Sequence, residues 1–266
     1  MEKIISVYSN NKGSSPETEE ILTEKFRKLG FDIVKGLCNR ADILVCIGGD
    51  GTFFDAIHKC NYPSIPIIGI NTGHLGFFQD VPPDRIDEFI GCYITGKYKI
   101  QQLSLIKASV KTASGVFEHC FLNETTIRST DFRSIHLNIY VDDKLIECCN
   151  GDGIVLSTPT GSTAFNYSLG GSIIDPRLDL VQITPIAPMN NTAYRTLSSS
   201  IILPSNTSLK LIPAMERDTN LCVIRDGYKN EYTNVEEVAI STFDKKINLI
   251  RSIDFDFWSK VNSKLL

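Results

Sequence analysis

Short apolar runs alternate with helical patterns along the first 100 residues of the chain. This alternation is typical of a parallel sheet whose faces are covered by helices. The pattern predicts an open α/β sheet domain over residues 1–100. Its strands are expected at residues 4–8, 31–34, 43–47 and 66–70. Its helices are expected at about residues 16–29, from about residue 53 after a glycine turn, and at about residues 84–95.

The first of these helices carries both start and stop signals. Ser14 stands three residues before Glu17, which is the spacing of a capping box, and Pro16 falls near the first turn. Gly30 follows the last apolar position and is expected to end the helix.

From residue 101 to about 245 the pattern changes to closely spaced β-rich runs. Turn signals such as Asp142-Asp143 and Asp226-Gly227 separate them, and long helical periodicity is largely absent. This region is therefore expected to form a second, all-β domain. The predicted strands are residues 105–112, 116–128, 134–141, 153–158, 200–203, 208–212 and 221–225.

The last stretch, residues 247–266, has apolar positions at roughly helical spacing. We expect it to pack an apolar face onto one of the two domains. The positions concerned are Phe255, Phe257, Trp258, Val261 and Leu265.

Composition and charge narrow the classes of function. The 266 residues are 42% hydrophobic and 22% charged, as in an ordinary globular protein. The formal net charge of −4 provides no basic field for nucleic acid or an anionic membrane surface. No segment approaches the roughly 18 apolar residues of a membrane helix. The eight cysteines form no C-x-x-C pair and suggest thiols in a reducing compartment. We expect a cytoplasmic protein with neither a nucleic-acid nor a membrane partner.

The strongest local signal for chemistry is a glycine turn directly after the predicted strand 43–47. It consists of Gly48, Gly49, Asp50, Gly51 and Thr52 and leads into a helical pattern. Backbone amides in such a turn reach a phosphate without interference from Cβ atoms, and a helix N-terminus favours negative charge. Gly48, Gly49, Gly51 and Thr52 are therefore candidate phosphate-binding residues. Asp50 could accept the proton of an attacking hydroxyl or bind the metal of a nucleoside triphosphate. The alternative is a tight turn in which Asp50 only caps the helix.

Two further segments in the β-rich region carry polar groups suited to a ligand. Asn123 and Glu124 place an amide and a carboxylate side by side in a strand-like stretch, which by itself favours a solvated or structural role. The run from Gly151 to Gly171 combines a strand, a hydroxyl-rich turn and a short helical pattern. Its small donors and acceptors favour a ligand site.

Other apparent motifs are excluded. The segment from Gly91 to Tyr98 matches a phosphate loop except at its last position, and it follows a helical pattern, so we interpret it as a helix stop. The four histidines show no metal-ligand spacing, so no metal site made by the protein is predicted. His74 is expected in a turn near the glycine turn, with a supporting role.

Together these segments resemble the NAD kinase family, and the resemblance extends over most of the chain. It is carried by residues 48–52, 71–77, 123–124 and 151–171, and by Asn190-Asn191 with Tyr194-Arg195-Thr196. The glycine-aspartate turn alone is shared with lipid kinases and phosphofructokinases, whereas the combination is specific. The resemblance implies an N-terminal Rossmann-like α/β domain, completed by residues of about 246–266 that return to it. It also implies a C-terminal β-sandwich-like domain over residues 101–245.

The resemblance further implies the reaction. Such a kinase transfers a phosphoryl group from ATP, or in some members from inorganic polyphosphate, to the 2′-hydroxyl of the adenosine ribose of NAD, giving NADP. Asp50 matches the general base of the family, and a divalent cation, magnesium, would enter with ATP. Glu124 would bind the nicotinamide-side ribose, with Asn123 near the adenine. The other expected substrate-binding positions are Gly51, Phe54, Asn150, Asp152, Thr163, Ala164, Phe165, Asn166, Ser168 and Ala187.

Two departures from the family pattern are present. Phe165 stands where many members have tyrosine, and Asn150 where some have arginine, so affinity or the preference between NAD and NADH is expected to differ. Family members are usually homodimers or homotetramers, and we expect a homo-oligomer.

Two other functions are weighed against this one. A lipid kinase would need a route for an apolar acceptor, and a dinucleotide sensor without catalysis would not need Asp50.

Overall fold

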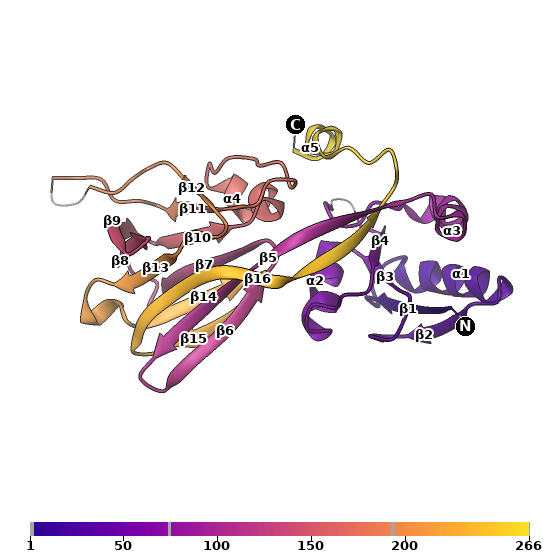
Figure 1. Cartoon of the computed structure of the whole chain (residues 1–266), viewed down its shortest axis with the longest axis horizontal. Helices are drawn as coiled ribbons and strands as arrows, with labels where there is room; N and C mark the ends of the chain where they lie inside the picture. The colour runs from indigo at the N-terminus through magenta and orange to yellow at the C-terminus, as the bar shows by residue number, and fades with distance from the viewer. Residues whose placement is uncertain (1–2, 74–75, 193–194, 266) are drawn as a thin grey trace. The chain divides into compact units, whose positions relative to one another are not determined.

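The computed structural model describes residues 3–73, 76–192 and 195–265. The chain divides into two compact units (Figure 1). Unit 1 consists of Met1–Leu103 and Lys245–Leu266, and unit 2 of Ser104–Asp244.

Unit 1 is built on a parallel sheet with the strand order β2-β1-β3-β4. The bounds are β1 (Ile4–Ser9), β2 (Asp32–Lys35), β3 (Ile43–Gly48) and β4 (Ile67–Asn71). The end of a long strand, β16 (Val235–Arg251), joins the sheet beside β4, with Leu249 opposite Ile67. Every residue of β3 is buried, as expected of a central strand covered on both faces. Because the strands are parallel, Ser9, Gly48 and Asn71 end at the same edge of the sheet.

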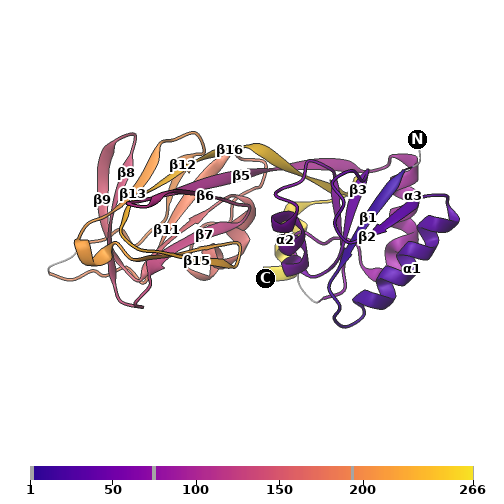
Figure 2. The same ribbon diagram turned by 90° about the horizontal axis from the view of Figure 1, so that it is seen from below.

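Helices cover both faces of this sheet. Helices α1 (Ser15–Lys28) and α3 (Ile86–Thr95), the latter preceded by the turn η1 (Pro83–Arg85), lie along one face, and α2 (Asp50–Lys59) lies on the other (Figure 2). Phe26 of α1 is fully buried and makes edge contacts with Phe31, Phe89 and Tyr93 at centroid distances of 5.3, 6.3 and 6.2 Å. This aromatic group joins the two helices to the strands in one core.

The helix boundaries confirm the predicted stops and correct one predicted cap. Gly30 follows α1 with a φ of +81°, and Gly96 ends α3 in the left-handed conformation. Ser14 occupies the N-cap position of α1, but its side chain makes no capping hydrogen bond. Its φ and ψ of −82° and 0° are not the extended values that direct an N-cap side chain toward the first turn, so the predicted capping box is wrong.

Unit 2 is all-β, as predicted, and consists of two antiparallel sheets. One has the order β16-β13-β8-β9, with β5 paired to both β16 and β6, and the other has the order β12-β11-β10-β7-β14-β15. Inward-facing apolar residues of both sheets form one core. The bounds are β5 (Lys99–Thr112), β6 (Gly115–Phe121), β7 (Glu124–Ser129), β8 (Ile135–Val141), β9 (Lys144–Gly151), β10 (Gly153–Ser157), β11 (Leu180–Ile186), β12 (Ile201–Pro204), β13 (Leu209–Pro213), β14 (Leu221–Arg225) and β15 (Tyr228–Tyr232). A short turn, η3 (Glu216–Asp218), precedes β14.

Three sequence expectations about these elements need correction. The predicted strand 116–128 is two strands, β6 and β7, because the chain turns at Leu122 and Asn123. Strands β9, β11, β15 and β16 were not predicted. The helical spacing assigned to residues 247–266 begins later, because residues up to Arg251 belong to β16 and the helix α5 is Phe257–Leu265. The final segment does return to unit 1, as expected.

We predict that Phe26→Ala lowers the free energy of unfolding of unit 1 by about 3–5 kcal/mol, since it removes a fully buried ring and leaves a cavity. The control is Ile21→Ala in the same helix, where the side chain is 41% exposed and the loss should stay below about 1 kcal/mol. Urea unfolding followed by circular dichroism measures both. Equal losses would show that α1 is not anchored through Phe26.

Candidate active site

The turn between β3 and α2 is shaped by close backbone packing. Gly48 ends β3 with a φ of +154°, and a Cβ atom there would lie 2.2 Å from Oγ1 of Thr52 and 2.5 Å from Nδ2 of Asn10. The same two side chains are joined, since Nδ2 of Asn10 donates to Oγ1 of Thr52 over 2.8 Å. Only glycine fits at position 48, and Gly49 then occupies the N-cap of α2.

A cavity of about 330 Å³ lies beside this turn, at the edge where β1 and β3 end. Its polar lining includes the backbone of the helix start and Lys12, which favour an anion, and the carboxylate of Asp55, whose charge is offset by a pair with Lys59. The lining residues are Tyr8, Asn10, Lys12, Gly49, Gly51, Thr52 and Asp55. Three of the four candidate phosphate-binding residues, Gly49, Gly51 and Thr52, therefore line one cavity, and Gly48 shapes the turn behind them.

The carboxylate of Asp50 does not cap its own helix. It accepts hydrogen bonds from the backbone N–H groups of Phe77, over 2.7 Å, and Phe78, over 3.1 Å. Burial raises the pKa of Asp50, while these two amides and the charges of Lys260 and Arg251 act in the opposite direction. The alternative in which Asp50 is only a helix cap is thus not what the structure shows, and a mostly buried carboxylate with a raised pKa is suited to accept a proton.

The loop after β4 closes over this turn. A Cβ atom at Gly76 would lie 2.7 Å from Oδ1 of Asp50, so a larger residue would displace the carboxylate. Nε2 of Gln79 donates to the carbonyl oxygen of Gly49 over 2.5 Å. Phe54 lies behind, buried in an aromatic group in which its ring is 5.9 Å from that of Phe53 and 5.1 Å from that of Phe78. In the structure Phe54 packs in the core of the unit. Its contact with substrate stays a prediction.

In unit 2 Asn123 lies in the turn from β6 to β7 and Glu124 begins β7, and a carboxylate holds the backbone of both. Asp226 accepts from the backbone N–H groups of Leu122, Asn123 and Glu124 over 2.8, 2.7 and 3.3 Å. This role of Asp226 was not predicted from the sequence. The only available signal was the Asp226-Gly227 turn, in which Asp226 adopts a φ of +43°.

The side chains of this pair are left with unused acceptors. Oδ1 of Asn123 and Oε2 of Glu124 are buried and have no hydrogen-bond partner among the described residues. Burial, with a further contribution from the negative charge of Asp226, raises the pKa of Glu124 to about 8. Buried polar atoms are rarely left without partners, so two adjacent ones indicate a place for a ligand.

The hydroxyl-rich run packs directly against this pair. A Cβ atom at Gly161 would lie 2.1 Å from the carbonyl oxygen of Asn123, and the same oxygen accepts from the N–H of Thr158 over 2.9 Å. Thr163 is buried within the turn η2 (Thr160–Thr163). Ala164 follows it and leads into the short helix α4 (Phe165–Ser168), on which Phe165 and Ser168 are exposed.

Asn166 holds this turn together from inside. It is fully buried, its Nδ2 donates to the carbonyl oxygens of Ser162 and Ser172 over 3.2 and 3.3 Å, and its Oδ1 accepts from Thr184 over 2.6 Å. Asn150 is likewise buried, with its Nδ2 donating to the carbonyl oxygen of Cys148 over 2.9 Å. Both amides are used within the fold, and their proposed contacts with substrate stay predictions.

The predicted substrate-binding residues of unit 2 fall into two groups at opposite ends of β10. Glu124 pairs with Ser157 at one end, whereas Gly153 at the other end pairs with Ile186, which Ala187 follows. Asp152 and Ala187 are both exposed at this second end, and Ala187 has a φ of +45°. At about 3.3 Å per residue, the length of β10 separates the groups by roughly 15 Å.

A cavity of about 430 Å³ opens at this second end and includes Asp152. Its other lining residues are Arg128, Ser129, Thr130, Phe132, Arg133, Cys222, Ile224, Lys229 and Glu231. The ring of Phe132 is 93% exposed at its edge.

Some residues of the predicted motifs lie outside the described residues, and the described residues contain neither a metal-binding cluster nor a membrane-spanning helix. His74 and Tyr194 lie outside the part of the chain that the structure describes. Across residues 3–73, 76–192 and 195–265, no three His, Cys, Asp or Glu side chains gather as a metal site. Over the same ranges, no helix is both long and apolar enough to cross a membrane.

Comparison with known proteins identifies the family. The family model described as ATP-NAD kinase N-terminal domain matches residues 3–98, and that described as ATP-NAD kinase C-terminal domain matches residues 122–252. The NAD kinase of Finegoldia magna is 39% identical over 271 residues, covering 99% of this chain and 98% of the relative. The chain belongs to the NAD kinase family. It is therefore an enzyme, a kinase of this family.

Other relatives and solved structures agree with this assignment. NAD kinase 1 of Listeria monocytogenes is 34% identical over 229 residues, covering 85% of this chain and 86% of the relative. The crystal structure of yeast NADH kinase complexed with NADH has a TM-score of 0.87 at 18% identity and covers 99% of this chain and 87% of that one. The NAD kinase from Archaeoglobus fulgidus in complex with ATP has a TM-score of 0.79 at 20% identity and covers 98% and 99%. At these identities the two structures show a shared fold, which confirms the predicted fold class.

We predict that Glu124 makes the stability of the protein depend on pH. In the unfolded chain this carboxyl ionises near pH 4.5, but in the folded state it stays protonated up to about pH 8. The folded state therefore binds one proton more than the unfolded chain between these two pKa values. The contribution of Glu124 to the free energy of unfolding is fully present below pH 4.5 and falls by about 1.4 kcal/mol for each pH unit up to about pH 8. Urea unfolding of the wild type and of Glu124→Gln measures it. The wild type should lose stability relative to the variant across this interval, and a difference that does not change with pH would contradict the burial of Glu124.

Proposed function

We propose that the protein phosphorylates the 2′-hydroxyl of the adenosine ribose of NAD, giving NADP, with ATP as the phosphoryl donor. The observation that carries the proposal is the Asp50 carboxylate. Asp50 stands in the chain between Gly49 and Gly51, which line the cavity at the start of α2; two backbone amides fix its carboxylate, and desolvation raises its pKa. The names of the relatives, and the solved structures with NADH and with ATP, support the choice of substrates.

The proposed step needs one base and a cradle for phosphate. The ribose 2′-oxygen attacks the γ-phosphorus of ATP, its proton passes to Asp50, and the bond from the γ-phosphorus to the bridging oxygen breaks to release ADP. The backbone of Gly49, Gly51 and Thr52 would hold the phosphates at the start of α2, and a magnesium ion bound to ATP would neutralise their charge. Most of the rate enhancement would come from orientation and from the fixed dipoles of the turn.

Recognition of NAD is assigned to unit 2. The unused acceptors of Asn123 and Glu124 would bind the hydroxyl and amino groups of the dinucleotide, and forming these bonds removes the cost of leaving them buried without partners. Phe165, whose ring is 38% exposed, offers an aromatic face to a base, without the hydroxyl of a tyrosine. Thr163, Ala164 and Ser168 surround it on the same turn.

The separation of Asp152 and Ala187 from this group supports a homo-oligomer. Since they lie at the far end of β10 from Glu124, we propose that they reach the NAD bound by a second copy of the chain. Phe132, exposed at the edge of the same cavity, is suited to be buried in that contact. A dimer and a tetramer both fit this arrangement.

Asp50→Asn is expected to lower turnover by roughly 100-fold or more while NAD binding is largely retained. An asparagine can accept from only one of the two amides of Phe77 and Phe78, so some loss of stability, about 1–3 kcal/mol, should accompany it. NADP formation from NAD is measured with ATP and with polyphosphate, and NAD affinity by calorimetry. Asp84→Asn, at an exposed position of unit 1, is the control. Unchanged turnover in Asp50→Asn would restrict Asp50 to a structural role.

The oligomer proposal predicts complementation between two inactive variants. Asp50→Asn and Asp152→Ala should each be nearly inactive alone, but mixed and exchanged subunits should regain about a quarter to a half of the wild-type turnover, because some sites then combine an intact Asp50 with an intact Asp152. Sedimentation velocity gives the number of subunits. If turnover does not recover in mixtures that are shown to exchange subunits, the oligomer proposal is wrong. Asp152 would then act in the site of its own chain or in no site.

A further inference from the structure

The peptide group between Phe77 and Phe78 carries ionic partners at both of its ends. Its N–H, which belongs to Phe78, donates to Oδ1 of Asp50 over 3.1 Å. Its carbonyl oxygen, which belongs to Phe77, accepts from Nη2 of Arg251 over 3.0 Å and from Nζ of Lys260 over 3.2 Å. One peptide group thus connects a carboxylate to two cations.

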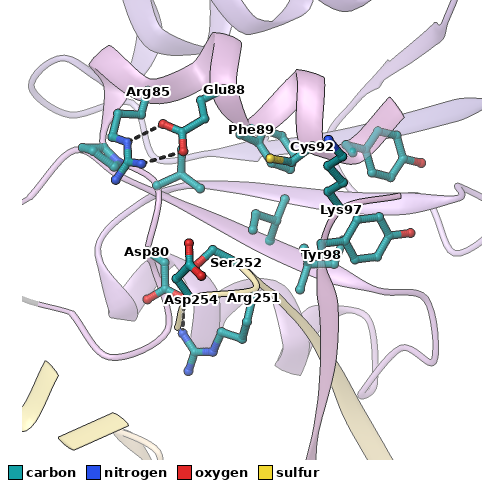
Figure 3. A pocket seen from close by; sticks show the side chains of 15 residues that line it. Asp80, Arg85, Glu88, Phe89, Cys92, Lys97, Tyr98, Arg251, Ser252 and Asp254 are labelled. Carbon is teal, nitrogen blue, oxygen red and sulfur yellow. Dashed lines mark hydrogen bonds and ion pairs between the residues drawn. The ribbon is translucent and has the colours of Figure 1, made fainter. Parts of the chain in front are cut away.

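Both cations are fixed in place. Arg251 ends β16 and is 4% exposed; it also pairs with Asp80, as Figure 3 shows, and its Nε donates to Oε1 of Gln101 over 2.8 Å. Lys260 lies in α5 with a side chain that is 12% exposed, and it also pairs with Asp80. The ring of Phe255 faces both, with its centroid 4.0 Å from the guanidinium carbon of Arg251 and 5.7 Å from Nζ of Lys260.

We propose that Arg251 and Lys260 are positioning residues that set the orientation and the basicity of the Asp50 carboxylate through this peptide group. Positive charge at the carbonyl oxygen polarises the amide and makes its N–H a stronger donor, since hydrogen bonds in a chain reinforce one another. A stronger donor holds the carboxylate in one orientation and favours its ionised form. The charges of the two cations also act directly, because they lower the pKa that burial of Asp50 raises.

This arrangement balances the opposing effects on the pKa of Asp50. Burial alone raises the pKa of Asp50 and disfavours the ionised form that accepts a proton, whereas pairing with a cation in direct contact would lower the pKa and make the carboxylate a weaker base. The two cations act on Asp50 across a peptide group and not by direct contact, and Asp80 offsets part of their charge. The proposal rests on the proposed function, in which Asp50 is the base.

The test replaces Lys260 in the intact protein. Lys260→Met removes the charge and the donor, Lys260→Gln removes the charge but keeps a donor, and Lys260→Arg keeps both. Lys246→Met, at an exposed lysine of the same unit, is the matched control. The first readout is the titration of the Asp50 side-chain carboxyl carbon by NMR, assigned with Asp50→Asn. We expect Asp50 to titrate at higher pH in Lys260→Met and Lys260→Gln, and near its wild-type value in Lys260→Arg and Lys246→Met.

The second readout is kinetic. In Lys260→Met the acidic limb of the kcat profile should move to higher pH, with kcat below that limb lowered about 10-fold and the KM values for NAD and ATP changed by less than about 2-fold. Above the limb, kcat should recover. The ionisable groups that face Asp50 and its loop from the described residues are Lys260 of α5, Arg251 of β16 and Asp80 of the loop itself. Of these, only Lys260 is changed.

The outcomes separate this inference from the proposed function. If Asp50 titrates unchanged in a folded Lys260→Met or Lys260→Gln while Asp50→Asn is inactive, the inference is wrong and the proposed function stands. If the titration moves but Asp50→Asn keeps wild-type turnover, Lys260 does control Asp50 and the proposed base is wrong. A uniform loss of kcat at every pH would reduce Lys260 to a structural role. Should Lys260→Met not fold, Lys260→Gln decides the result.

Discussion

A carboxylate buried at the first residue of a helix can persist only if fixed donors surround it. In this protein the constraint falls on Asp50, and much of unit 1 can be understood as its support. The loop after β4 delivers two amides to the carboxylate, and Gly76 must lack a Cβ atom for the loop to approach. The rings of Phe53 and Phe78 stack at 4.8 Å and fix that loop on α2. The parallel sheet brings the two connections together because β3 and β4 end at the same edge.

Unit 2 uses a half-buried carboxylate for a different purpose. Asp226 is satisfied by three backbone amides and thereby fixes the backbone of the turn at Asn123. The adjacent side chains are held where their own acceptors have no partner among the described residues. Leaving such atoms buried without partners costs free energy of folding, which the rest of the fold must offset. In unit 1 backbone donors thus satisfy the carboxylate of Asp50, whereas in unit 2 the side-chain acceptors of Asn123 and Glu124 are left without partners among the described residues.

The sequence predicts those features that leave a pattern in side chains. The central strand β3 is a continuous apolar run, and the core strands of unit 2 are nearly as clear. Strand β15, with the sequence YKNEY, is mostly exposed and gives no apolar signal, and the polar positions of β16 obscure its length. The glycine turn was recognisable because glycine is required where Cβ atoms would collide. The donors to Asp50 were not, because a backbone N–H of Phe77 or Phe78 has no signature in the sequence. Asn166 was predicted to contact a ligand, and its amide can donate and accept hydrogen bonds. The structure shows that the side chain is buried and uses these bonds to fix the turn.

The support of Asp50 also depends on long separations along the chain. The carbonyl oxygen of Phe77 binds Arg251 and Lys260, which are 174 and 183 residues further on. Strand β16 starts in unit 2 and ends in unit 1, so the segment that carries both cations reaches the loop only after the β-rich unit has been synthesised. Contacts at such separation form late and at a high cost in chain entropy. The glycine turn and its helix are local and can form early, but the peptide group that donates to Asp50 gains its contact with Lys260 only when the last helix docks. The surroundings of Asp50 are therefore complete only when the C-terminal part of the chain is in place.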